Sequence, residues 1–388
     1  MIKVRYACYL VVLSLCCCRR PYNPPASSSP NSYLVVEGVI NPGSDSTIIK
    51  LSKTVHLNAK VTLNPLLGAT VTVESDNNTS WPLIDVNNTG SYSSPGLNLP
   101  ASQKYRLRIN TGDGHQYLSD MVAVKPTPPI DSIGYFTQNG VINLYVNTHD
   151  PANATRYYRW EYNETWQFHS TYPSLYVLDT ALNTIVLRTP EQNVYSCFGN
   201  DVSSNILLTS TTKLTKDVVY QSPLTAFPIN SEKIETKYSI LVKQYALTSE
   251  AYQFYQNIQK NTEQLGSIFD AQPSQLVGNI HNVANAAEPV IGYITVTNVQ
   301  SKRVFLTNAI IPQYTVPDYP ADCEKDTAYY VTGLLGTSVQ DVLINRPITD
   351  IPTFGIFVSD KLVGFEYSSS ICVDCTLRGT TKTPSFWK

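Results

Sequence analysis

Short alternations of apolar and polar residues run through the chain from residue 33 onward, and they restrict the fold more than any other feature. A period of two places successive side chains on opposite faces of an extended strand, whereas an amphipathic helix needs a period near 3.6. The clearest alternating stretches are residues 34–39, 48–51, 69–74 and 105–110. The turn-forming stretches between them are residues 76–78, 87–90 and 111–114. Short strands at this spacing predict an immunoglobulin-like or transthyretin-like β-sandwich.

The stretch at residues 124–129 interrupts this pattern with three prolines, Pro126, Pro128 and Pro129. Proline cannot donate to a strand ladder, so this stretch cannot belong to a central strand. We therefore predict an N-terminal β-sandwich at residues 32–128 and a larger β-rich domain at residues 129–388. The strands expected in the larger domain are residues 132–137, 141–147, 157–162, 184–187, 205–210, 238–245, 290–299 and 302–306.

One helix is expected in the second domain, over residues 249–265. Thr248 or Ser249 can cap its N-terminus, and Glu250 suits the positive end of the helix dipole. Its apolar face and its terminating glycine are Ala251, Tyr255, Ile258, Leu265 and Gly266. The predicted fold class is therefore mainly β, with one packed α-helix in the C-terminal domain.

The N-terminus has the pattern of an export signal. Lys3 and Arg5 precede an apolar run at residues 6–15, which is too short to cross a bilayer comfortably. The run ends in three consecutive cysteines, and Leu15 stands three positions before Cys18, as in bacterial lipoprotein signals. We predict a signal peptide at residues 1–17 and lipid attachment at Cys18. The alternatives are Cys16, Cys17 and an ordinary cleaved signal with incidental cysteines.

Residues 18–31 are rich in proline and serine, a composition that cannot bury enough apolar surface to fold. We interpret them as a tether between a lipid anchor and the folded domains. No apolar run after residue 18 approaches spanning length, so the lipid would be the only membrane attachment.

Four cysteines follow the tether: Cys197, Cys323, Cys372 and Cys375. An even number in an exported protein favours structural disulfides, and three pairings are open. Cys372 and Cys375 form a C-x-x-C pair that could also bind zinc or carry out redox chemistry. The sequence offers neither a second ligand pair for zinc nor the βαβ context of a redox motif.

No motif identifies a catalytic reaction. The five histidines are dispersed, and the nucleophile elbow and the phosphate-binding glycine loops are absent from the sequence. We therefore predict a protein that is not an enzyme and that uses no cofactor or metal. Lys and Arg total 28 against 30 Asp and Glu, so there is no basic excess for nucleic acid.

Aromatic residues are concentrated at residues 157–168. On a strand, Tyr158, Trp160 and Tyr162 would share one face, and Tyr157, Arg159 and Glu161 the other. Trp160 and Trp166 are candidates for stacking on a sugar or on a partner's apolar surface, and Trp166 is expected on a loop. The alternative is that these rings belong to the core of the sheet.

A set of local patterns, in a fixed order, resembles one known family. They are residues 36–38, 68–73, 90–92, 105–109, 129–133, 157–160, 242–247, 250–252, 278–280, 292–293, 372–375, 379 and 384–387. The order is similar to that of the Bacteroidota outer-membrane lipoproteins grouped as domain-of-unknown-function family 4249, over about residues 33–388. The resemblance implies a lipid-anchored outer-membrane protein without known catalytic residues. It also implies an accessory role beside a TonB-dependent transporter.

The alternative function is a stand-alone surface lipoprotein that binds a glycan or another nutrient, or acts as an adhesin. Arg19 and Arg20 replace the acidic residues that often follow the lipidated cysteine in surface-exported members, so surface and periplasmic orientations both stay open. Four sites match the Asp-Ser/Thr pattern of O-glycosylation in that phylum and must be exposed if modified. They are Ser46, Ser132, Thr180 and Thr327.

Overall fold

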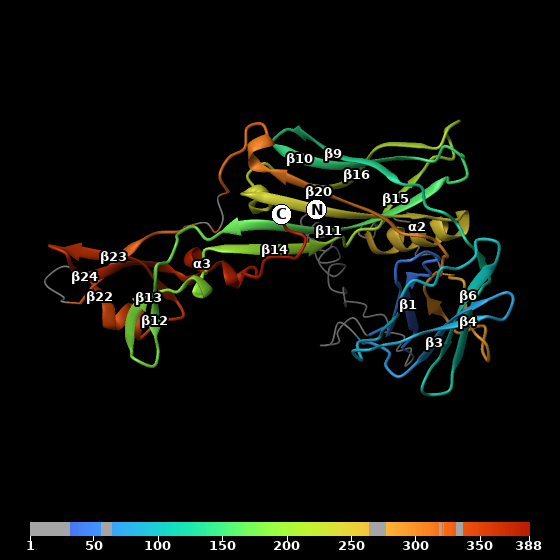
Figure 1. Cartoon of the computed structure of the whole chain (residues 1–388), viewed down its shortest axis with the longest axis horizontal. Coiled ribbons are helices and arrows are strands. Elements are labelled where there is room, and N and C mark those ends of the chain that lie inside the picture. Colours follow the sequence, from blue (N-terminus) through green and yellow to red (C-terminus); the bar gives the residue numbers. More distant parts are fainter. Residues whose placement is uncertain (1–31, 56–63, 264–276, 318–319, 321, 331–336) are drawn as a thin grey trace, which may run out of the picture.

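A computed structural model describes residues 32–55, 64–263, 277–317, 320, 322–330 and 337–388. The predicted signal peptide, the tether and the candidate lipid sites Cys16, Cys17 and Cys18 lie outside these residues. Three β-rich units follow one another along the long axis (Figure 1). We call them the first sandwich, the central sandwich and the distal lobe. The expected mainly β fold is confirmed.

The first sandwich consists of a four-stranded and a six-stranded sheet that enclose one apolar core. Its early strands are β1 (Leu34–Val39), β2 (Thr47–Lys53), β3 (Thr70–Ser75), β4 (Ser80–Leu83), β5 (Ser91–Ser94), β6 (Lys104–Asn110), β7 (Gln116–Ser119) and β8 (Val122–Ala123). The predicted alternation is visible in β6, where Tyr105, Leu107 and Ile109 are buried and the residues between them are not.

The first sandwich is completed by residues from much later in the chain. Strand β18 (Ile280–Asn282) pairs with β7, and β19 (Val290–Ile291) runs parallel to β1. Ile294 and Val296 are fully buried in the same core. The prediction that all residues after 128 belong to the second domain is therefore wrong for residues 280–296. Periodicity locates a strand but does not identify the sheet that it joins.

The strand expected over residues 290–299 is also shorter than predicted. Regular pairing ends at Gly292, where a Cβ atom would lie 2.5 Å from the carbonyl oxygen of Val36. Only a glycine allows the two backbones to approach this closely.

The central sandwich packs a three-stranded sheet, in the order β16-β10-β9, on a five-stranded sheet, in the order β14-β11-β17-β20 with β15 beside β11. The bounds are β9 (Ile130–Gln138), β10 (Val141–His149), β11 (Tyr157–His169), β14 (Ser196–Val202), β15 (Leu207–Ser210), β16 (Val218–Pro228), β17 (Lys237–Ala246) and β20 (Gln300–Thr307). Tyr158 and Trp160 of β11 face the core, as the alternation predicts.

Helix α2 (Ser249–Glu263) lies where the central and first sandwiches meet (Figure 1). The Thr248 hydroxyl accepts a hydrogen bond from the Ala251 amide at 3.2 Å, which confirms the predicted cap. Ala251 packs with Val39 of the first sandwich and with Tyr245 of the central sheet. The expected final residues of the helix, 264 and 265, lie outside the described residues.

The distal lobe contains a hairpin and a four-stranded sheet in the order β22-β21-β24-β23. Its elements are β12 (Tyr176–Asp179), β13 (Thr184–Leu187), β21 (Asp326–Tyr329), β22 (Thr337–Ser338), β23 (Asp350–Val358), β24 (Lys361–Ser369) and α3 (Ser370–Val373). The remaining short helical turns are η1 (Pro190–Gln192), η2 (Glu232–Ile234), η3 (Asn308–Ile310), η4 (Gln340–Ile344) and η5 (Cys375–Leu377).

Two disulfides hold the distal lobe, and they resolve the pairing that the sequence leaves open. Cys323 is bonded to Cys372 within the lobe, and Cys197 of β14 is bonded to Cys375. The two cysteines of the C-x-x-C pair therefore have different partners and do not bond to each other.

Candidate functional site

A cleft of about 820 Å³ lies between the first sandwich, the outer face of the central five-stranded sheet and α2. Its floor carries Arg159 and Glu161 from β11 and Lys243 and Tyr245 from β17. The wall from α2 contributes Phe254, Tyr255 and Ile258. The opposite wall includes Val35, Glu37, Val39, Ile48, Lys50, Ile291 and Tyr293. The cleft thus joins parts of the chain that are distant in sequence.

Arg159 is the central side chain of the floor, with only 13% of its side chain exposed. Its guanidinium lies 4.4 Å from the ring centre of Tyr245 and 4.6 Å from that of Tyr255. Its Nη1 donates to Oε1 of Glu161 at 2.5 Å, and the Tyr245 hydroxyl donates to the other oxygen at 2.8 Å. Stacking on the electron-rich ring faces together with this ion pair fixes the arginine in one position.

The charge state of the floor follows from these contacts. Burial favours the neutral form of Glu161, but the charge of Arg159 and the hydrogen bonds from Tyr245 and Arg159 outweigh it and lower the pKa. Burial and the charge of Glu161 raise the pKa of Tyr245, so its hydroxyl stays protonated. The floor therefore presents one carboxylate and two cations, Arg159 and Lys243.

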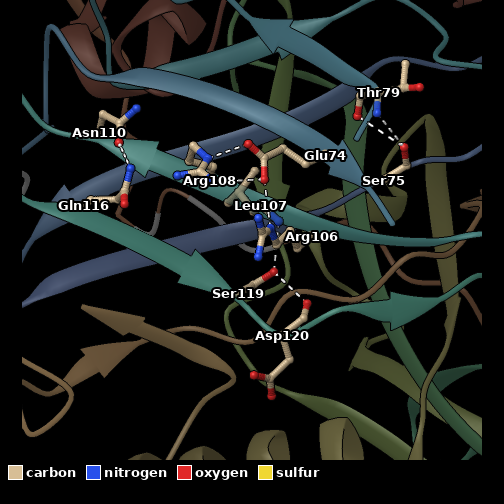
Figure 2. Close-up of polar contacts among 10 residues, drawn as sticks. All are labelled: Glu74, Ser75, Thr79, Arg106, Leu107, Arg108, Asn110, Gln116, Ser119 and Asp120. Carbon is tan, nitrogen blue, oxygen red and sulfur yellow. Dashed lines mark hydrogen bonds and ion pairs between the residues drawn. The ribbon is translucent and has the colours of Figure 1, made fainter. Parts of the chain in front are cut away.

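A second polar cluster lies on the outer face of the first sandwich (Figure 2). Glu74 of β3 accepts from Nε of Arg106 at 2.8 Å and also pairs with Arg108. Nearby, Gln116 donates to Asn110 at 2.9 Å across β6 and β7. These groups engage one another on an open sheet face, so we interpret the cluster as a structural link between strands.

Trp160 is not available for stacking on a ligand, and that prediction is wrong. Only 1% of the residue is exposed, its ring stacks on Tyr158, and its Nε1 donates to Gln244 at 2.8 Å. The alternation places it in the sandwich core, as the alternative interpretation held.

Trp166 lies within β11 and not on a loop, so this expectation is also wrong. A Cβ atom on Gly199 would lie 2.4 Å from its ring, which shows how closely the indole covers the neighbouring strand. Nζ of Lys233 lies 5.1 Å from the ring centre, and the indole NH donates to Glu232 at 3.3 Å. The half-buried ring therefore already has protein partners.

The four candidate glycosylation residues, Ser46, Ser132, Thr180 and Thr327, are all exposed. Exposure is required for the modification but does not test it, so the modification stays a prediction. Among the described residues, no group of three or more His, Cys, Asp or Glu could hold a metal ion. In the same part of the chain, no helix has the length and apolarity to span a bilayer.

The sequence did not single out the cleft residues. The alternation placed Arg159 and Glu161 on the face of β11 that points away from the core. Their placement was a usable signal for a polar site, because two charges on the outer face of an aromatic-rich strand need a partner or water. Nothing local showed that Tyr245 and Tyr255 would meet them there.

Two adjoining sandwiches with a cleft at their junction define a multidomain, mainly β protein whose candidate site lies between domains. The chain belongs to the family described as domain of unknown function (DUF4249), whose family model matches residues 19–303. The family assignment expected from the sequence is thereby confirmed. The strands β21 to β24 of the distal lobe lie beyond the matched residues.

Similarity to solved structures is low. A candidate carbohydrate-binding protein from Bacteroides uniformis matches with 11% identity over 56% of this chain and 90% of its own, with a TM-score of 0.15. Activated alpha-2-macroglobulin from Escherichia coli matches with 9% identity over 87% of this chain and 26% of its own, with a TM-score of 0.18. These TM-scores are too low to establish a common fold. No curated protein matches the chain.

Proposed function

We propose that this protein is a non-enzymatic, ligand-capturing lipoprotein of the outer membrane that works with a TonB-dependent transporter. The observation that carries the proposal is the cleft at the junction of the two sandwiches. Its volume of about 820 Å³ falls in the range of small-molecule sites, and it combines apolar walls with a few fixed polar groups.

The chemistry of the floor supports binding over catalysis. A general base works best with a pKa near the working pH. The hydrogen bonds from Arg159 and Tyr245 hold the Glu161 carboxylate in place, and its pKa is lowered, away from the working pH. Arg159 and Glu161 are arranged to hold a fixed charge pattern and not to transfer a proton.

The membrane assignment rests on the signal pattern at residues 1–18, and the transporter on the family resemblance. The tether limits where the cleft can be. Fourteen residues span at most about 50 Å when fully extended, and β1, which lines the cleft, begins three residues after the tether ends. A ligand held in this cleft would remain within reach of a membrane transporter.

The test is a pull-down from gently solubilised outer membranes, with a tag after Lys388 and mass spectrometry of the eluted proteins. We expect a TonB-dependent barrel in stoichiometric amount. Recovery of the chain alone would contradict the accessory role, and glycan-array binding would then be measured to test the stand-alone alternative.

A second measurement tests the anchor. Metabolic labelling with a fatty acid should label the wild type and the variants Cys16→Ser and Cys17→Ser, but not Cys18→Ser. Label retained in Cys18→Ser would contradict lipid attachment at this residue.

A further inference from the structure

The floor of the cleft carries two positive charges, on Arg159 and Lys243, and one negative charge, on Glu161. Lys243 lies directly across from Glu161 in the β11–β17 register and is half-buried. The Lys243 ammonium group forms no hydrogen bond or ion pair with any residue that the structure describes. Its charge helps to lower the pKa of Glu161, but the carboxylate is hydrogen-bonded to Arg159 and Tyr245. Nε of Arg159 is buried and likewise has no hydrogen-bond partner among the described residues.

The other charged groups around the cleft do not cancel this excess. Glu37 and Lys50 face each other across β1 and β2 and are both exposed, so they balance each other. Asp45 is exposed on the loop before β2 and is screened by solvent. A partly desolvated cation without a partner is costly, and an incoming anion would remove that cost.

The walls have a different character. Ile48 is 47% exposed, and the half-buried side chains of Val35, Ile206, Ile258, Ile291 and Val299 also line the cleft. A small inorganic anion would leave this apolar surface in contact with water. A neutral sugar would favour open aromatic faces, but the guanidinium of Arg159 already covers one face of both Tyr245 and Tyr255.

The geometry points to a small amphipathic anion as the ligand of this cleft: a carboxylate or similar monoanionic group attached to an apolar body. The anionic group would contact Lys243 in the positive field of Arg159, and the apolar body would contact the aliphatic wall between α2 and β1. This inference rests on the proposed ligand-capturing function and names the class of ligand.

The test uses three probes that carry a phenyl ring on a four-carbon chain and differ in the polar group at its end: 4-phenylbutanoate, 4-phenylbutylamine and 4-phenylbutan-1-ol. Each is titrated calorimetrically into the purified full chain, in the same buffer and detergent, with a protein-free blank. We expect one site for 4-phenylbutanoate, weaker binding at high salt, and no measurable binding of the amine.

The variant Lys243→Gln keeps the size of the side chain but removes its charge, and we expect about tenfold weaker binding of 4-phenylbutanoate. Lys361→Gln is the matched control, because it removes the same charge from an exposed position in the distal lobe. We expect this control to bind like the wild type. Thermal melting of both variants checks that they are folded.

The inference is overturned if the amine or the alcohol binds as tightly as the anion, if both lysine variants lose affinity equally, or if 4-phenylbutanoate does not bind. A third variant, Ile258→Trp, fills the cleft. It distinguishes a failure of the anionic ligand class from a failure of the proposed ligand-capturing function. Binding of a neutral probe that disappears in Ile258→Trp would leave ligand capture standing and exclude the anionic class. Failure of all three probes, together with recovery of the chain alone in the pull-down, would overturn both.

Discussion

The first sandwich and the distal lobe hold their strands together by different means. Among the described residues, nineteen buried apolar side chains form the core of the first sandwich, and no cysteine occurs in residues 32–128. In the described part of the distal lobe the main core has six such side chains, and two disulfides fasten the lobe at its base. We therefore expect that a unit too small to bury much apolar surface depends on its covalent links.

Removal of the Cys323–Cys372 bridge should have the largest effect. In the double variant Cys323→Ser and Cys372→Ser, a loop with a sequence separation of 49 is no longer closed. The chain-entropy model gives a loss of about 4 kcal/mol for a loop of this size. Limited proteolysis with mass spectrometry should show new cleavage within residues 323–373.

Peptides from the first sandwich should stay protected in the same digestion. A distal lobe that resists the protease as well as the parent does would show that its small core is sufficient, and the comparison would fail.

The next largest effect is expected from a single core residue that the chain contributes late to the first sandwich. Ile294 is fully buried there, so Ile294→Ala should destabilise the sandwich by about 3 kcal/mol. Urea unfolding of the variant would measure this loss. Ile348→Ala, at a position that is 84% exposed in the distal lobe, is the control and should change stability by less than about 0.5 kcal/mol. Equal effects would mean that residues 280–296 are dispensable to the first sandwich.

The polar link of Figure 2 should contribute less than the core. Glu74→Gln leaves Arg106 and Arg108 without their shared carboxylate and should cost about 1 kcal/mol at pH 7. The hydrogen bond from Arg108 is the largest cause that lowers the pKa of Glu74 below its ordinary value of 4.5. The contribution is therefore present above pH 4.5 and is lost as the pH falls through the folded-state pKa.

Thermal melts of wild type and Glu74→Gln at a series of pH values would measure this dependence. The difference between them should shrink as the solution becomes acidic. A difference that is constant down to the acid transition would show that the ion pair is not its source.

The smallest effect is expected at the tip of the β12–β13 hairpin. Leu182 is 70% exposed, so Leu182→Ser should change the free energy of unfolding by less than about 0.5 kcal/mol. A larger loss in urea unfolding would show that the distal lobe has apolar contacts beyond its small core.

Sequence periodicity located β1, β2, β3 and β6 of the first sandwich and six of the eight described strands of the central sandwich, because alternation is a local property. It missed β14 and β16 of the central sandwich. Residues 184–187 were predicted as a strand and form β13. The strands β23 and β24 were missed, since two register shifts between them interrupt the period of two. The partners of β18 and β19 were also out of reach, because pairing between distant segments leaves no local pattern.

The cleft was predictable only in part. The alternation gave the correct face for Arg159 and Glu161, but their role depends on Tyr245 from β17 and Tyr255 from α2. Those contacts exist only after the helix packs on the sheet. Trp160 and Trp166 were predicted to stack on a ligand because large aromatic rings suit both cores and binding sites. Composition alone does not distinguish these two roles.

The nested topology of the first sandwich has a consequence for the order in which the protein is made. Leu34 pairs with Val290, and almost the whole central sandwich is synthesised between the two. While residues 32–128 leave the ribosome, their sheets lack β18 and β19, and their core lacks Ile294 and Val296. Such non-local pairing slows folding more than it costs in stability. The first sandwich therefore cannot be completed until residue 296 has been made, only shortly before β20 completes the central sandwich.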